Sequence, residues 1–226
     1  KTLDNIDLEI ESGKQYALVG ENGAGKTTLA YLLMQFLVPQ IGQITINNKE
    51  IDLWQKKDWH QWIGWIPQKP KIFNTTLLEN VRLLQKSITE KQVIDALEKA
   101  SLNQMLTDLP QGLNTPLLDQ GARLSGGEIQ RVGLARVFIR NCPFVILDEP
   151  TTHLDPETEI QQVDTIRNLQ QGRTTITIAH RLNTIQYADE IIVMKRGRII
   201  CNGDHLSLLD RCEEYRRLIN SMQEQR

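Results

Sequence analysis

The sequence predicts an α/β protein whose core is interrupted by a helical subdomain. Short apolar strands occur on both sides of a block with helical periodicity, which extends from about residue 74 to residue 141. Near the start of the chain, a glycine-rich loop joins a predicted buried strand to a predicted helix. At 226 residues, the chain is long enough for one large domain or for a core with a subdomain.

The first fifty residues predict a strand, a loop and a helix, with extra β structure around them. Ile6, Leu8 and Ile10 alternate with polar residues, as expected for one face of a strand. Tyr16–Val19 is uniformly apolar and predicts a buried strand. A helix from about Lys26 to Phe36 and a hairpin over Gln43–Ile51 are expected to follow, with the hairpin turning at Asn47-Asn48.

The rest of the chain predicts a helical block followed by more strands. Thr89 and Gln92 have the spacing of a capping box, which predicts a helix start. An apolar stripe of Val93, Ile94, Leu97 and Ala100 is expected behind it. The later strands are expected at Phe144–Leu147, Thr174–Ala179, Glu190–Met194 and Arg198–Cys201.

Composition and charge narrow the function classes. The chain is 40% hydrophobic and carries a formal net charge of −2, so it has no overall basic field, and no nucleic-acid partner is expected. No apolar run approaches the roughly 18 residues of a membrane span. The three cysteines form neither a metal-ligand spacing nor an even set for disulfides, which favours a reducing compartment.

The stretch GENGAGKTT, residues 20–28, predicts a phosphate-binding loop. Its glycines allow backbone N–H groups to turn toward phosphate oxygens, and the following helix presents its positive end there. Lys26 is expected to reach the β- and γ-phosphates, and the Thr27 hydroxyl to bind Mg²⁺. A glycine-rich turn before a helix is the simpler alternative. The predicted nucleotide-binding residues are Gly20, Glu21, Asn22, Gly23, Ala24, Gly25, Lys26, Thr27 and Thr28.

Two acidic residues end the apolar strand predicted at Phe144–Leu147. Ligands bind outside the carboxyl ends of strands in open α/β sheets, so Asp148 is expected to hold Mg²⁺ there. Glu149 is expected to polarise the attacking water as a general base. Taken alone, a strand that ends in Asp-Glu-Pro is more often an ordinary exposed strand exit. Together with the phosphate-binding loop, it indicates a catalytic site.

The stretch LSGGEIQR, residues 124–131, predicts a second anion site. Ser125 is expected to cap a helix whose first turn contains Gly126 and Gly127 with open backbone N–H groups. The alternative is a capped helix with a glycine-rich entry. One nucleotide does not need two such sites from one chain, whereas two chains that meet head to tail would each complete the other's site.

The chain resembles the nucleotide-binding domain of ATP-binding cassette (ABC) transporters over essentially its whole length. The resemblance rests on GENGAGKTT, Gln68 in WIPQ, LSGGEIQR, FVILDEPTTHLD and His180 in IAHR, which stand in the order typical of that family. It implies a P-loop NTPase with a RecA-like core of mostly parallel strands, an antiparallel β subdomain and an inserted helical subdomain. A single ABC ATPase domain is then expected over residues 1–226, with core and β subdomain at 1–73 and 142–226 and the helical signature subdomain at 74–141.

The same resemblance assigns roles to further residues. It implies that Gln68 senses Mg²⁺ and the attacking water, that His180 contacts the γ-phosphate, and that Asp155 crosses a dimer interface. Without it, Gln68 reads as a solvated loop residue and His180 as the end of a strand. The residues expected to contact the partner's ATP are Leu124, Ser125, Gly126, Gly127 and Glu128.

The resemblance also implies an exporter at the cytoplasmic face of the inner membrane. The stretch from Pro67 to Asn80 looks like exporter cassettes, in which ATP binding and hydrolysis by a homo- or heterodimer drive a transmembrane domain. That domain is not in this chain and is expected to precede it. Exposed apolar groups around Ile72 and Phe73 are expected to contact it, and the alternative is that they pack locally. The DQGAR and DEPTTHLD stretches resemble the cysteine/glutathione exporter branch linked to cytochrome bd assembly, with lipid, peptide and drug exporters as open alternatives. The main alternative is a soluble ABC ATPase of the DNA-repair or translation-factor type. A stand-alone importer subunit is a third interpretation, which fits the exporter-like stretch after Gln68 less well.

Overall fold

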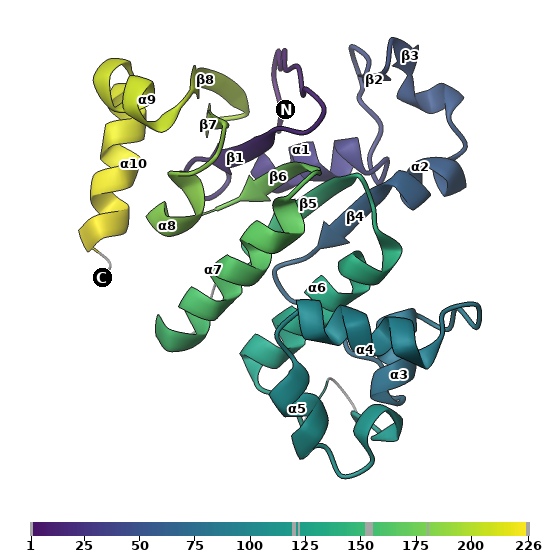
Figure 1. Ribbon diagram of the computed structural model, residues 1–226. Helices are drawn as coiled ribbons and strands as arrows, with labels where there is room; N and C mark the ends of the chain where they lie inside the picture. The colour runs from purple at the N-terminus through teal and green to yellow at the C-terminus, as the bar shows by residue number, and fades with distance from the viewer. Residues whose placement is uncertain (1, 119–120, 122, 152–155, 180, 225–226) are drawn as a thin grey trace. The chain divides into compact units, whose positions relative to one another are not determined.

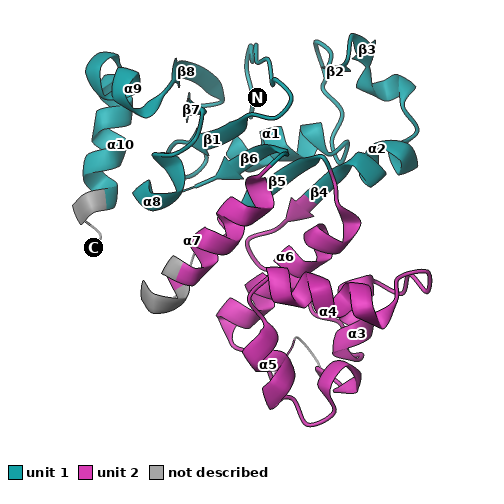
Figure 2. Cartoon of the chain, in the orientation of Figure 1, with its two compact units in different colours: residues 1–64, 143–148, 172–226 teal, residues 65–142, 149–171 magenta. Residues whose placement is uncertain are grey.

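The computed structural model describes residues 2–118, 121, 123–151, 156–179 and 181–224. The chain forms two compact units, which are shown in different colours in Figure 2. The first, called here the core unit, consists of Lys1–Gly64, Pro143–Asp148 and Gly172–Arg226. The second, called the helical unit, consists of Trp65–Cys142 and Glu149–Gln171.

A six-stranded sheet organises the core unit (Figure 1). Its strand order is β4-β5-β6-β1-β7-β8, and the boundary between the two units falls within β4. β5, β6, β1 and β7 pair in parallel, whereas β8 pairs with β7 in the antiparallel sense. The mostly parallel α/β core is thereby confirmed. The strands are β1 (Gln15–Val19), β4 (Ile63–Ile66), β5 (Phe144–Asp148), β6 (Thr174–Ile178), β7 (Glu190–Lys195) and β8 (Arg198–Gly203).

A small antiparallel hairpin, which lies between β1 and β4 in the sequence, forms a separate two-stranded sheet. β2 (Thr45–Ile46) pairs with β3 (Lys49–Glu50), and the two turn residues Asn47 and Asn48 have φ values of 51° and 62°. Two consecutive positive φ angles are typical of the type I′ turn, and asparagine tolerates them better than most residues. The hairpin predicted at Asn47-Asn48 is confirmed. The helices of the core unit are α1 (Lys26–Leu33), η1 (Ile51–Leu53), α2 (Lys56–Trp62), α8 (Leu182–Ile185), α9 (His205–Arg211) and α10 (Glu213–Glu224).

The strand predicted around Ile6, Leu8 and Ile10 is wrong. These three side chains are half-buried and alternate with exposed neighbours, as the pattern predicts. However, no described strand pairs with this segment, so it forms no β ladder. Alternation reports which side chains face the protein, but a strand also needs a neighbour for its backbone hydrogen bonds.

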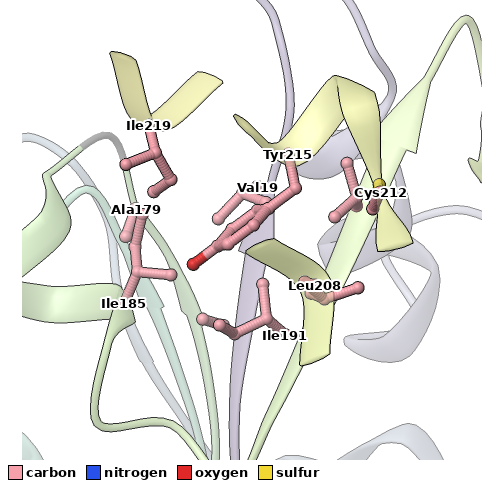
Figure 3. Packing of buried hydrophobic residues seen from close by; sticks show 10 residues of the cluster. Val19, Ala179, Ile185, Ile191, Leu208, Cys212, Tyr215 and Ile219 are labelled. Carbon is pink, nitrogen blue, oxygen red and sulfur yellow. The ribbon is translucent and has the colours of Figure 1, made fainter. Parts of the chain in front are cut away.

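The C-terminal helices pack on the sheet through one apolar cluster. Figure 3 shows the ring of Tyr215, on α10, in the middle of this cluster. The Tyr215 hydroxyl lies 2.7 Å from Nδ1 of His205, so the buried phenol keeps a polar partner. Burial raises the pKa of Tyr215 to about 12. The cluster comprises Ala17, Val19, Ala179, Ile185, Ile191, Val193, Leu208, Cys212, Tyr215 and Ile219.

The structure contains a disulfide, although the number and spacing of the cysteines favoured a reducing compartment. Cys201 on β8 and Cys212 at the end of α9 form a disulfide, with their Cα atoms 6.6 Å apart. Cys142 is free and buried. The expectation failed because cysteine count and sequence spacing do not show which cysteines the fold brings together.

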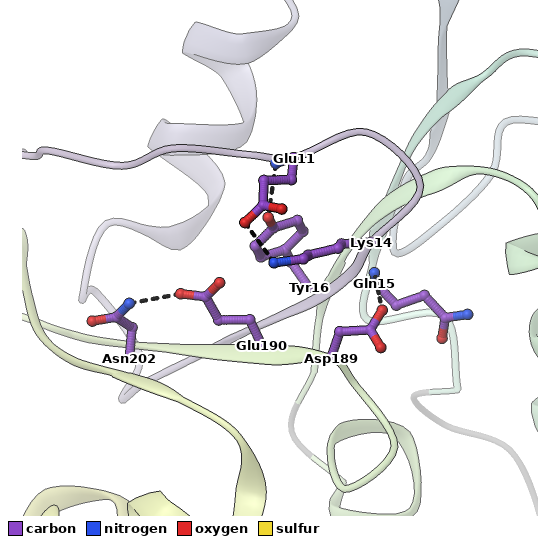
Figure 4. A network of polar contacts seen from close by, with 7 residues as sticks. All are labelled: Glu11, Lys14, Gln15, Tyr16, Asp189, Glu190 and Asn202. Atoms are coloured by element: carbon purple, nitrogen blue, oxygen red, sulfur yellow. Dashed lines mark hydrogen bonds and ion pairs between the residues drawn. The ribbon is translucent and has the colours of Figure 1, made fainter.

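Two polar contacts hold the start of β1, one of them to Asp189, which directly precedes β7 (Figure 4). The backbone N–H of Gln15 donates to Oδ2 of Asp189 at 2.8 Å, and the N–H of Glu11 donates to the Tyr16 hydroxyl at 2.8 Å. Desolvation is the main reason that the pKa of Tyr16 is raised. These contacts fix the start of the strand that leads into the predicted phosphate-binding loop.

The helical unit is organised around α6 (Gly126–Arg140), which packs against α3, α4 and α7. The capping box of Thr89 and Gln92 is present at the start of α4, as predicted. Ile94 is 43% exposed, so it does not belong to the predicted stripe, because it lies about 100° around the helix from Val93. The other helices of this unit are α3 (Leu77–Arg82), α4 (Glu90–Lys99), α5 (Asn103–Asp108), η2 (Gly112–Asn114) and α7 (Pro156–Gln170). None of the described helices in either unit combines the length and apolarity needed to cross a bilayer.

Candidate active site

The predicted phosphate-binding loop occupies residues 20–25, between β1 and α1. Gly25 caps α1 in a left-handed conformation with φ 104°, which favours glycine. Gly20 has φ 150°, and a Cβ at this position would lie 2.2 Å from the carbonyl oxygen of Met194. The loop therefore passes so close to β7 that only glycine fits at its start. Between these two glycines, Glu21, Asn22 and Gly23 are exposed.

Lys26 lies over the loop that precedes it. Its Nζ donates to the carbonyl oxygens of Gly20 at 2.6 Å and Glu21 at 3.0 Å, and the residue is only 6% exposed. The loop thus holds a positive charge close to the beginning of α1, where the first N–H groups of a helix lack intrahelical acceptors. Thr27 is exposed in the first turn, and Thr28 is half-buried. This arrangement suits a polyphosphate.

Asp148 lies at the same sheet edge as the loop. Both Asp148 and Leu18 pair with Ile178 of β6, so they stand at the same level on strands that flank β6. Two strand spacings separate them by about 10 Å. Asp148 is half-buried at this edge. The Thr27 hydroxyl and the Asp148 carboxylate are hard oxygen ligands of the kind Mg²⁺ prefers, and Mg²⁺ bound to a nucleotide needs few protein ligands.

Within the helical unit, Gln68 and Glu149 are in contact although they lie 81 positions apart in the sequence. Nε2 of Gln68 donates to Oε2 of Glu149 at 2.6 Å, and both residues are half-buried. Glu149 has a φ of 48°, which is uncommon for a residue with a Cβ and is found most often at functional sites. The structure brings together two of the residues that the sequence predicted as catalytic.

The LSGGEIQR stretch begins α6 as predicted. The Ser125 hydroxyl accepts from the N–H of Glu128 at 3.2 Å, and the Glu128 carboxylate accepts from the N–H of Ser125 at 2.7 Å. This reciprocal pair is a capping box. Ser125 and Gly126 are exposed, Leu124 and Glu128 are half-buried, and Gly127 is buried. The exposed helix start presents a hydroxyl and the positive end of a 15-residue helix.

Two predicted site residues, His180 and Asp155, lie outside the described residues. Of the apolar pair expected at the surface, Phe73 is 44% exposed, but Ile72 is only 4% exposed and faces Gly121. The prediction of an exposed Ile72 is therefore wrong, and the alternative of local packing applies to it, because Gly121 lies against its side chain.

Sequence reasoning missed a set of residues on α6 that contact the segment after β4. Nε2 of Gln130 donates to the backbone carbonyl of Gln68. Nη1 of Arg136 donates to the backbone carbonyl of Lys71 at 2.8 Å. The sequence offered only the presence of Gln130 within LSGGEIQR. It shows neither that this residue is buried nor which backbone carbonyl it contacts.

The sheet with its glycine loop, the lysine and the acidic strand end define a P-loop nucleotide-binding domain. The family described as "ABC transporter" matches residues 3–152. The chain belongs to the ABC transporter family, of which it represents an ATPase domain.

Similar proteins extend well beyond the length of this chain. The chain is 41% identical over 219 residues to the ATP-dependent lipid A-core flippase of Saccharophagus degradans, a match that covers 97% of this chain and 37% of the flippase. It is 40% identical over 223 residues to ABC transporter B family member 6 of Dictyostelium discoideum, covering 99% of this chain and 33% of that protein. A structure described as a bacterial Atm1-family ABC exporter with ATP bound superposes with a TM-score of 0.90 at 37% identity, covering 96% of this chain and 38% of that chain. The chain thus spans between 33% and 38% of the length of these proteins.

Proposed function

We propose that this chain is the ATP-hydrolysing domain of an exporter and that two such domains, each binding ATP, power transport across a membrane. The observation that supports this most is the hydrogen bond from Gln68 to Glu149. This bond joins Gln68 to Glu149, although the two are far apart in the sequence. Glu149 directly follows Asp148, the last residue of β5. Such a pair suits the handling of a water molecule next to a bound triphosphate.

ATP is proposed to bind through its phosphates at residues 20–28. The N–H groups of the loop and of the first turn of α1 donate to phosphate oxygens. Lys26, which in this structure donates to Gly20 and Glu21, adds its positive charge at the β- and γ-phosphates. Because a Cβ at Gly20 would collide with the Met194 carbonyl, the closeness of this loop to β7 depends on glycine.

Mg²⁺ is proposed to accompany ATP, held by Thr27, Gln68 and Asp148. When bound, the ion neutralises charge that develops on the phosphates. Thr27 is exposed at the start of α1, and Asp148 lies at the same edge of the sheet as the loop. Their oxygen atoms are of the type that the ion binds.

Hydrolysis is proposed to use Glu149 as the general base, with Gln68 and His180 as further catalytic residues. The Glu149 carboxylate takes a proton from the attacking water. The Gln68 amide orients that carboxylate through the hydrogen bond described above and contacts the water. His180 is assigned to the γ-phosphate.

Each ATP is proposed to lie between two copies of the domain or between this chain and a related partner. The exposed helix start at Leu124, Ser125, Gly126, Gly127 and Glu128 contacts the ATP that is held by the partner's loop. Asp155 is assigned to the interface. This arrangement explains why one chain carries both a phosphate-binding loop and a second anion-binding helix start.

The domain is proposed to act with a transmembrane domain at the cytoplasmic face of the inner membrane. Support comes from the relatives, which are named as flippases and exporters and of which this chain matches only 36% to 38% of the length. The soluble repair-type or translation-type ATPase is not favoured. The cysteine/glutathione exporter branch stays a prediction, since the relatives bear other names.

The proposal is tested by measuring ATP hydrolysis of the intact protein with and without Mg²⁺, and of its Glu149→Gln variant. We expect Mg²⁺-dependent turnover in the native protein and a loss of at least about 100-fold in the variant, with ATP affinity retained. Turnover at the native rate in Glu149→Gln would overturn the assignment of the general base. Tight, salt-sensitive DNA binding would instead favour the repair-type alternative.

A further inference from the structure

One side of α6 follows the backbone of the segment after β4 at three successive positions. Gln130 contacts the carbonyl of Gln68, Gly133 faces Pro70, and Arg136 contacts the carbonyl of Lys71. The three helix residues are spaced by three, so each lies about 4.5 Å further along the axis than the previous one. All these residues belong to the helical unit. The helix and the segment 68–71 therefore run alongside each other.

The Gln130 contact is made by a buried amide. Gln130 is 5% exposed, and its Nε2 donates to the main-chain oxygen of Gln68. Its Oε1 has no hydrogen-bond partner within the part of the chain that the structure describes. A buried amide with an unpaired oxygen is a costly way to fill space, so an apolar residue would serve packing better. The contact with Gln68 is the reason the structure offers for a glutamine here.

Gly133 brings the helix close enough for that contact. A Cβ on Gly133 would lie 2.8 Å from Cγ of Pro70 and 3.2 Å from its Cβ. Pro70 is a rigid ring and is buried, so it would have to move with its backbone. Because Pro70 is two residues from Gln68, a displacement there would change where the Gln68 side chain points.

Arg136 anchors the far end of the same segment. Its guanidinium donates to the carbonyls of Lys71 at 2.8 Å and Asn80 at 2.9 Å, and to Oδ1 of Asn80 at 3.1 Å. Asn80 is fully buried, and its Oδ1 accepts from the N–H of Phe73 at 2.8 Å. The segment is thus held between α6 and α3 by hydrogen bonds to its backbone, which do not depend on its own side chains.

We propose that Gln130 is a positioning residue for ATP hydrolysis, which together with Gly133 fixes the backbone of Gln68 so that the Gln68 amide reaches Glu149. The inference rests on the proposed roles of Gln68 and Glu149. Gln130 is the fifth residue after the Ser125 cap, on the same helix. A shift of the helix start at Ser125 is therefore transmitted through α6 to Gln68. In this way, contact of Ser125 with the partner's ATP is coupled to the hydrogen bond between Gln68 and Glu149.

The test compares Gln130→Met with Gln35→Met in the intact protein. Gln35 is a matched control because it is also 5% exposed, its Nε2 donates to a backbone carbonyl, that of Ile51, and its Oε1 has no partner among the described residues. We expect Gln130→Met to lower kcat about 10-fold, with nucleotide affinity within about 2-fold of native. Gln35→Met is expected to keep the native kcat. An unchanged kcat in Gln130→Met, or equal losses in both variants, overturns the proposal.

A double-variant cycle separates positioning from a general loss of structure. If Gln130 acts through Gln68, adding Gln130→Met to a Gln68→Ala protein lowers its residual kcat no further. A further 10-fold loss in that background contradicts the proposal. Should Gln130→Met fail to fold, Gly133→Ala decides, with a lowered kcat and retained nucleotide binding expected, and an unchanged kcat overturning the inference.

The Glu149→Gln variant distinguishes the two levels of the account. If it is inactive while Gln130→Met and Gly133→Ala turn over at the native rate, only the positioning role fails. If Glu149→Gln itself turns over normally, the proposed function of Glu149 fails, whatever the effect at Gln130.

Discussion

The side-chain amide of Gln68 donates a 2.6 Å hydrogen bond to the carboxylate of Glu149, across 81 residues of sequence. Both residues belong to the helical unit, whereas the phosphate-binding loop and Asp148 belong to the core unit. Glu149 has a left-handed backbone conformation, which directs its side chain differently from that of an ordinary strand residue. The helical unit thus contains both the Gln68–Glu149 pair and α6, the helix that begins after Ser125.

Adding a methyl group to the start of the phosphate-binding loop is expected to abolish nucleotide binding. In Gly20→Ala, the new Cβ would lie 2.2 Å from the Met194 carbonyl oxygen, so the loop must move away from β7. We expect a loss of ATP affinity of at least about 100-fold, measured by calorimetry, because the N–H groups of the loop no longer point toward the phosphate oxygens. Gly13→Ala is the control, since Gly13 also has a positive φ but has open space around it. That variant is expected to lose about 1 kcal/mol of stability and no ATP affinity. Native ATP affinity in Gly20→Ala would contradict the assignment of residues 20–28 as the phosphate-binding loop.

A large charged residue at the signature helix start is expected to abolish turnover without abolishing binding. In Ser125→Arg, the arginine occupies the exposed helix start proposed to contact the partner's ATP. The phosphate-binding loop is unchanged, so each chain still binds nucleotide. Loss of the cap itself costs about 1 kcal/mol. Thr89→Arg is the matched control because it removes the same kind of capping box from α4. We expect ATP hydrolysis to persist in Thr89→Arg and to be lost in Ser125→Arg. Loss of nucleotide binding in Ser125→Arg would contradict the proposal that Ser125 contacts the ATP bound by the partner chain.

Breaking the disulfide is expected to loosen the C-terminal helices. Cys201 and Cys212 enclose a short loop, so in the chain-entropy account their link contributes on the order of 3 kcal/mol. Chemical denaturation should show Cys212→Ser less stable than the native protein by up to this amount. A reductant should lower the stability of the native protein to that of the variant and leave the variant unchanged. Without reductant, alkylation of the unfolded protein should modify one thiol, that of Cys142. Modification of three thiols would show that the disulfide between Cys201 and Cys212 is absent.

The stability contributed by Tyr215 is expected to disappear at alkaline pH. Burial raises its pKa to about 12, whereas the unfolded chain has the ordinary value near 10. The unfolded state therefore loses its phenol proton first, and the stabilisation is complete below about pH 10 and decreases as pH rises toward 12. The free energy of unfolding should fall more steeply with pH in the native protein than in Tyr215→Phe. The comparison removes the opposing effect of Arg136, whose pKa is lowered to about 10 by burial. Parallel curves would contradict the buried titration.

Most of the core could be predicted from sequence because its signals are local. A run such as Phe144–Leu147 is apolar on both faces, as a buried parallel strand requires, and it forms β5. The capping box at Thr89 and the turn at Asn47-Asn48 depend on residues close in sequence, and both are present. The segment at Ile6–Ile10 failed because its alternation says nothing about a pairing partner.

The site could be predicted only in part for a related reason. Motif residues such as Lys26, Ser125 and Glu149 were identified by their neighbours in sequence. Gln130 and the Gln68 carbonyl lie 62 positions apart in the sequence, and the contact involves a backbone atom, which no residue type encodes. The pairing of Cys201 with Cys212 and the burial of Ile72 depend in the same way on where the fold returns the chain.

The most direct test of the account is the molecular mass in solution of the Glu149→Gln chain with ATP and Mg²⁺, measured by sedimentation at high protein concentration. With hydrolysis blocked, the account predicts a dimer that dissociates when ATP is removed and does not form when Ser125→Arg is added. A chain that binds ATP under these conditions and remains a monomer would contradict the shared site.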